Sequence, residues 1–169
     1  MVPDLDLQLQ VVLKALQDTI KPALDPADKP AGEQLGLIMA TLGLVRANLP
    51  KQRRFVRRLL EKAIALAETL NAGSAEAALA QAIDDARAML RDPEAEAFEV
   101  EACRGALNAR LAERIAAAGE GGIAALSADV LSGTRGTVEL IRAFNAGSGF
   151  EGADSTVPPI DTLLTPARV

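Results

Sequence analysis

Residues 51–70 read KQRRFVRRLLEKAIALAETL, and this stretch decides the fold. Its apolar side chains recur at three- and four-residue spacing, which places them on one face of an α-helix. Basic side chains take the opposite face. The stretch therefore predicts an amphipathic helix with one face buried in a helical core. Its apolar stripe consists of Phe55, Val56, Leu59, Leu60, Ala63, Leu66 and Leu70.

The composition extends this prediction to the whole chain. The 169 residues are 49% hydrophobic but only 2% aromatic, so Ala and Leu must supply most of the core volume. Both are strong helix formers, and the β-favouring aromatic residues are nearly missing. We expect further helices over residues 3–24, 31–49, 75–91, 93–118 and 123–145. The predicted fold is all-α, an antiparallel bundle of five or six helices over 1–145 with an irregular tail over 146–169.

Local signals predict where these helices begin and break. Asp92 followed by Pro93 is typical of an N-cap and first helical position, so the fifth helix should start there. Phe98 would then pack against that start. Gly133 and Gly136 should split the sixth helix into two pieces.

The second predicted helix differs in kind, because residues 35–45 are apolar on nearly every side. A helix that is apolar all round is a buried one, so we expect it at the bundle centre or at a subunit interface. Asp28 is its expected N-cap. Small residues at Gly36, Ala40 and Gly43 would allow another helix to approach closely, which predicts close helix packing or a dimer interface at this stripe.

The residues that are missing restrict the chemistry. The chain has no His, Trp or Tyr and a single cysteine, Cys103. Histidine is the usual proton carrier near neutral pH and the commonest metal ligand, so ordinary catalytic triads and zinc or di-iron sites are excluded. The carboxylates between residues 94 and 101 fit a helix start, where negative charge is favourable. We therefore predict no metal and no cofactor and assign no catalytic residues, while Asp, Glu, Lys and Cys leave catalysis itself open.

Charge and hydropathy exclude further classes. A net charge of −5 and a pI near 4.8 argue against a nucleic-acid-binding protein, which needs basic surface. The first twenty residues lack the basic segment of a signal peptide, and no apolar run reaches the ~18 residues of a membrane span. A lone cysteine forms no internal disulfide. The expected location is the cytoplasm, and the alanine-rich composition is typical of bacteria.

The most distinctive local feature is the basic face of residues 51–62, which holds six of the 18 basic residues. Arginine is suited to bidentate contacts with phosphate and carboxylate groups. The candidate anion- or partner-binding residues are Arg53, Arg54, Arg57 and Arg58. The alternative is a solvated face balanced by the acidic later helices. Nucleic-acid binding is disfavoured, because no aromatic residues interleave to stack bases.

The N-terminal third shows a family resemblance. It is carried by an amphipathic helix, the motif Lys21-Pro-Ala-Leu24, and QLGLIMATLGLVRANL over residues 34–49. This pattern resembles the opening of a family of small all-helical bacterial domains of unknown function. Members of that family are encoded beside acyl-CoA dehydrogenases and aminoglycoside-phosphotransferase-like kinases. The resemblance implies an accessory role near acyl-CoA metabolism and carries over no catalytic residues.

Two functions follow as hypotheses. The first is a non-catalytic interaction or accessory protein that self-associates, as a dimer, and could bind another protein. The second is a binder of a small anionic or acyl-type ligand in an inter-helix cavity with an arginine-lined mouth. Met39, Leu42 and Leu59 would line that cavity.

Overall fold

The computed structural model describes residues 4–72, 76–148 and 155–165, with only the backbone described for 119–126. The fold is all-α, as predicted, and the described residues contain no strand. The chain divides into two compact units, one of residues 1–51 and 145–155 and the other of 52–144 and 156–169. The predicted domain over 1–145 did not include this division. Of the predicted tail, residues 149–154 and 166–169 lie outside the described part.

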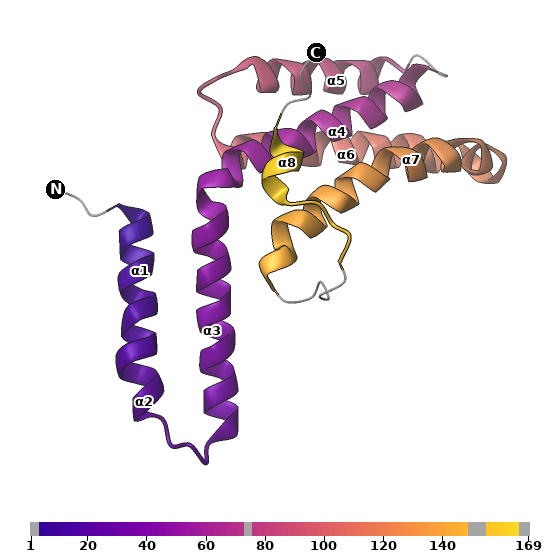
Figure 1. Cartoon of the computed structure of the whole chain (residues 1–169). Helices are drawn as coiled ribbons and strands as arrows, with labels where there is room; N and C mark the ends of the chain where they lie inside the picture. The colour runs from indigo at the N-terminus through magenta and orange to yellow at the C-terminus, as the bar shows by residue number, and fades with distance from the viewer. Residues whose placement is uncertain (1–3, 73–75, 149–154, 166–169) are drawn as a thin grey trace. The chain divides into compact units, whose positions relative to one another are not determined.

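The first unit is built around a helical hairpin (Figure 1). Its first arm comprises α1 (Leu5–Ala15), one π-helical turn η1 (Leu16–Ile20) and α2 (Lys21–Ala23). Its second arm is α3 (Lys29–Asn48), followed by the 3-10 turn η2 (Leu49–Lys51). The Asp28 side chain accepts a hydrogen bond from the Ala31 amide at 3.1 Å, so the predicted N-cap of α3 is confirmed.

The second unit has α4 (Gln52–Ala72) at its core (Figure 1). Helix α4 packs against α5 (Ala77–Arg91) and α6 (Ala97–Ala117), which also pack against each other. The short helix α8 (Ile160–Leu164) contacts α4 and buries its first and last residues, so part of the predicted tail is ordered and docked. The buried α4 side chains are Phe55, Val56, Leu59, Leu60, Ala63, Ile64, Ala67 and Leu70.

Helix α7 (Gly119–Asn145) is continuous, so the predicted break at its glycines was wrong. A Cβ atom added at Gly133 would lie 2.7 Å from Leu66 Cδ1, and one at Gly136 would lie 2.7 Å from Lys62 Nζ. The glycines therefore allow α7 to pass close to α4. The Phe55 and Phe144 rings stack between the same helices, with centroids 3.8 Å apart.

The start of α6 also differs from the prediction. Asp92 Oδ1 accepts a hydrogen bond from the Glu94 amide at 2.8 Å, which closes a local turn in place of a helix start. Helix α6 begins at Ala97 with a capping box, in which Glu99 accepts from the Glu96 amide at 2.8 Å and Glu96 accepts in return. Phe98 is 72% exposed, so the predicted packing of this ring against the helix start was wrong.

The predicted burial of α3 at the bundle centre was also wrong. Leu35 is its only buried residue in the described structure, and Leu37, Ile38 and Val45 are exposed. The apolar composition of α3 is therefore not explained by packing among the described residues. A subunit interface at this helix stays a prediction.

We expect Leu60→Ala to lower the free energy of unfolding by about 3 kcal/mol, because Leu60 is fully buried and its truncation leaves a cavity. Leu131→Ala is the matched control, since Leu131 is 71% exposed on α7 and its truncation should cost less than about 0.5 kcal/mol. Urea denaturation followed by circular dichroism measures both. Equal losses would contradict the described core.

Candidate functional site

The two arms of the hairpin pack against each other, and the aliphatic side chains that are buried or half-buried form one line on each arm, from which we infer the line of contact. Leu9, Leu13 and Leu16 occupy this position on the first arm, and Leu35 and Leu42 on α3. Near the open end of the hairpin, two hydrogen bonds of 2.7 and 3.0 Å join one guanidinium to one carboxylate, Arg46 to Asp6. The hydrogen bonds from Arg46 lower the pKa of that carboxyl group. The pair is exposed, so it fixes register more than it adds stability.

One side of this hairpin is aliphatic. With 100° per residue, Leu5 and Val12 lie about 50 to 70° from the contact line of their arm, and Ile38 and Val45 lie as far from that of α3 in the same rotational sense. The arms are antiparallel, so flanks of the same sense lie on the same side of the hairpin. All four side chains are exposed. We call these four residues the aliphatic side.

The opposite side of the hairpin carries small and basic residues. Gly32, Gly36 and Gly43 lie about 70 to 110° from the contact line of α3 in the other sense, and Lys14 lies about 130° from that of the first arm in the same sense as the glycines. A Cβ atom at any of these glycines would meet nothing within 4 Å among the described residues. Ala40 is exposed as well, so among the described residues no close helix contact covers the predicted stripe of Gly36, Ala40 and Gly43. We call this the glycine side.

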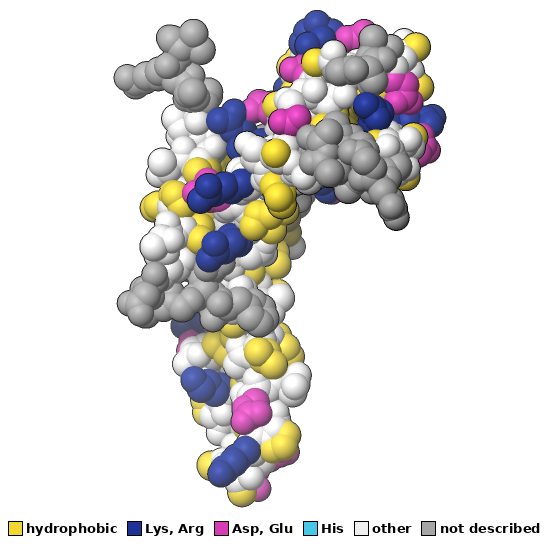
Figure 2. All heavy atoms as spheres, turned by 90° about the vertical axis from the view of Figure 1, so that its right-hand side faces the viewer, with side chains coloured by type: hydrophobic (Ala, Val, Ile, Leu, Met, Phe, Trp, Pro, Cys, Tyr) yellow, Lys and Arg dark blue, Asp and Glu magenta, His cyan; other side chains and the backbone are white. Residues whose placement is uncertain are grey.

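Exposed hydrophobic side chains are concentrated on the hairpin. Figure 2 shows hydrophobic side chains at the molecular surface on the face in view. Exposed apolar side chains that gather on one face mark interaction sites in soluble proteins. The exposed large hydrophobic residues of the hairpin are Leu5, Leu7, Val11, Val12, Ile20, Leu37, Ile38, Val45 and Leu49.

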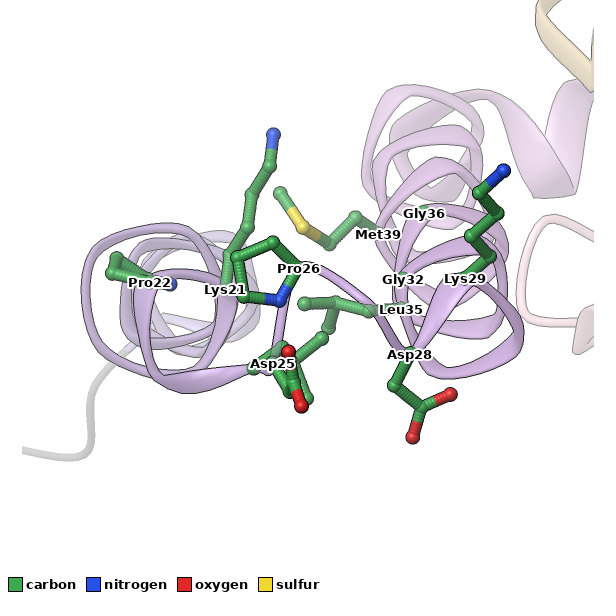
Figure 3. Close-up of a pocket in the computed structure, with 11 residues that line it drawn as sticks. Lys21, Pro22, Asp25, Pro26, Asp28, Lys29, Gly32, Leu35, Gly36 and Met39 are labelled. Atoms are coloured by element: carbon green, nitrogen blue, oxygen red, sulfur yellow. The ribbon is translucent and has the colours of Figure 1, made fainter.

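A cavity of about 440 Å³ lies at the closed end of the hairpin (Figure 3). Its lining comes from α2, the turn after it and the first turns of α3. Apolar side chains form most of its wall. Sequence reasoning did not identify this site, because its lining joins residues of two helices and the turn between them, which no pattern within one helix brings together.

The four predicted arginines lie on α4, in the second unit, and two of them bind backbone. Arg53 donates to the Pro93 carbonyl. Arg57 donates to the Leu90 carbonyl and, at 3.2 Å, to the Asp92 carbonyl. These acceptors follow or end α5, where carbonyl groups lack helical partners and the helix dipole favours a cation. The two arginines therefore fasten the α5–α6 connection to α4.

The other two arginines differ from this pair. Arg58 forms an ion pair with Glu61 on the same helix. Arg54 is exposed, and no hydrogen bond or ion pair ties its side chain to another described residue. The cavity residues proposed with these arginines belong to different units, since Leu59 is buried in the second unit while Met39 and Leu42 belong to the hairpin. An anion site at the arginines stays a prediction, with Arg54 as the member not otherwise engaged.

Cys103 is half-buried on α6. Burial raises the pKa of its thiol, and the nearby negative charge of Asp85 raises it further. A reactive cysteine needs a lowered pKa, so these surroundings favour the protonated, unreactive thiol. Among residues 4–72, 76–148 and 155–165, no group of three acidic or cysteine side chains is arranged to hold a metal ion.

Comparison of the chain with protein-family models, curated proteins and solved structures finds no match. The resemblance of the N-terminal third to the family of small helical domains therefore stays a sequence-based prediction. Within the described part of the chain, no helix combines the length and apolarity that crossing a bilayer requires.

The backbone contacts of Arg57 predict a structural role. We expect Arg57→Ala to lower the free energy of unfolding by about 1 kcal/mol, because two carbonyl groups lose a charged donor. Arg54→Ala is the matched control and should change it by less than about 0.5 kcal/mol. Chemical denaturation of the two variants measures the difference. A larger loss in Arg54→Ala would contradict this assignment.

Proposed function

We propose that this protein is a non-catalytic interaction protein that self-associates through the aliphatic side of its N-terminal hairpin. The observation that carries the proposal is the exposure of Leu5, Val12, Ile38 and Val45 along one side of two antiparallel helices. The accessory role near acyl-CoA metabolism and the cytoplasmic location belong to the same proposal, and the family resemblance supports them.

The hairpin lacks a core of its own. Leu35 is the single buried residue of α3, and no residue of α1, η1 or α2 is buried. Most helical stability in proteins comes from packing of an apolar face, and an isolated helix pair buries too little apolar surface to supply it. A partner that covers the aliphatic side would supply the missing burial.

A second copy of the hairpin fits this surface. Leu5 and Val12 are seven residues apart, as are Ile38 and Val45, which is the spacing that recurs in helical bundles. Two hairpins packed by these sides would form a four-helix bundle. The contact would be isologous, because the same four residues would face themselves across a two-fold axis.

The area available on this side of the hairpin is close to the lower end of the range for specific interfaces. The first arm has 19 residues from Leu5 to Ala23 and is therefore about 28 Å long, and a pair of helices is about 20 Å wide. Each copy could bury roughly 550 Å², or about 1,100 Å² in total. This exceeds the area of ordinary crystal contacts and approaches that of specific interfaces.

We expect the full-length chain to be a dimer in native mass spectrometry and Val12→Glu/Ile38→Glu to be a monomer. The carboxylates would be desolvated in the apolar contact, at a cost of several kcal/mol. Leu131→Glu is the matched control and should remain dimeric, because Leu131 lies on α7 and is already 71% exposed.

The Gly43→Leu variant tests which side of the hairpin forms the dimer contact. We expect this variant to remain dimeric, because Gly43 lies on the glycine side. Loss of the dimer in Gly43→Leu together with its retention in Val12→Glu/Ile38→Glu would overturn the aliphatic interface in favour of the glycine side. A monomeric native chain at tens of micromolar would overturn self-association itself.

A further inference from the structure

The cavity at the closed end of the hairpin has the features of a ligand site. Its volume of about 440 Å³ lies within the range of small-molecule pockets. Its apolar wall is formed by Pro22, Leu24, Pro26, Leu35 and Met39. Figure 3 shows Leu35 and Met39 reaching from α3 into the space between the two arms.

Two glycines keep this cavity open. Gly32 and Gly36 line it one helical turn apart. A Cβ atom at either position would meet nothing within 4 Å among the described residues, so larger side chains would project into free space. Glycine within a helix costs about 1 kcal/mol relative to alanine. The helix carries this cost at two positions where side chains would occupy the cavity.

The charged groups at the cavity lie on two different sides. Figure 3 shows the ammonium groups of Lys21 and Lys29 on one side and the carboxylates of Asp25 and Asp28 on the other. Both carboxylates are engaged, since Asp25 accepts from the Ala27 amide at 2.9 Å and Asp28 caps α3. Neither ammonium group has a hydrogen-bond or ion-pair partner among the described residues.

We propose that this cavity binds an unbranched aliphatic chain that ends in one anionic group. The apolar wall would bury the chain, at roughly 25 cal/mol for each Å² of apolar surface removed from water. Lys21 and Lys29 would hold the anionic end, because a lysine ammonium acts as a compact positive charge with three donors. The site differs from the predicted arginine site in position and cation, and it does not depend on dimer formation.

Methionine-methyl NMR of the full-length chain tests this proposal. The chain has three methionines, and Met39 lines the cavity while Met89 lies on α5 in the second unit. We expect decanoate, added below its micelle concentration, to shift the Met39 methyl resonance and leave that of Met89 unchanged. The Met39→Leu variant identifies the resonance. Equal shifts of both resonances, or no shift at Met39, would overturn the proposal.

Two variants test the contributions of the apolar wall and of the two lysines to ligand binding independently. Gly32→Leu should abolish decanoate binding by filling the cavity, whereas Gly105→Leu, an equally open glycine on α6, should not change it. Lys21→Gln/Lys29→Gln should weaken decanoate binding about fivefold, as expected for two exposed charge pairs, and leave the binding of uncharged decanol unchanged.

The remaining outcomes are also decisive. Unaltered decanoate affinity in Gly32→Leu would show that the ligand lies elsewhere and would overturn the site. An equal loss of decanoate and decanol affinity in the lysine variant would overturn the role of the two ammonium groups. Decyl phosphate in the same titration shows whether a carboxylate or a phosphate end is preferred, and tighter binding of decanol than of both anions would overturn the anionic preference.

Discussion

The burial of the α4 stripe between α5 and α6 is the contact on which the second unit depends. Helix α4 supplies eight buried side chains, and both neighbouring helices pack on it. Because the chain has few aromatic residues, these contacts are made largely by Leu and Ala, and the helices must approach closely to fill space. Gly133 permits that approach on the α7 side, where the Cβ atom of a larger residue would lie 2.7 Å from Leu66 Cδ1, whereas at Gly136 the nearest group is the flexible end of Lys62.

The same helix shows why a charged pattern is ambiguous in a sequence. The spacing of Arg53 and Arg57 satisfies the requirements of an anion site, since both guanidinium groups point to one side. In the structure the anionic partner of these groups is the end of α5 itself, whose carbonyl oxygens carry partial negative charge. A basic helix face therefore predicts that negative charge lies nearby and leaves its source undetermined.

The first unit has a different physical organisation. Its helices are rich in apolar residues, yet only Leu35 is buried among them, so most of their apolar side chains remain exposed at the surface. The two sides of the hairpin differ in chemistry, with branched aliphatic side chains on one and glycines with lysines on the other. This difference allows one side to be occupied by a second copy while the other keeps a cavity open, without competition between the two proposed contacts.

The sequence alone determined the all-α class, the extent of most helices, the Asp28 cap and the stripe that α4 buries, because these depend on three- and four-residue periodicity and on local hydrogen bonds. It also predicted burial of residues 35–45, at the bundle centre or at a subunit interface, and the structure leaves most of these residues exposed. Tertiary structure decided the rest. Helix α6 begins at Ala97, and Gly133 is a position of close packing on α7. Arg53 and Arg57 donate to backbone carbonyls, Arg58 pairs with Glu61, and Arg54 is exposed. The cavity beside Lys21 and Lys29 joins residues from both arms of a turn. Each of these outcomes depends on which segments meet in space, and a pattern within one helix carries no information about its neighbour.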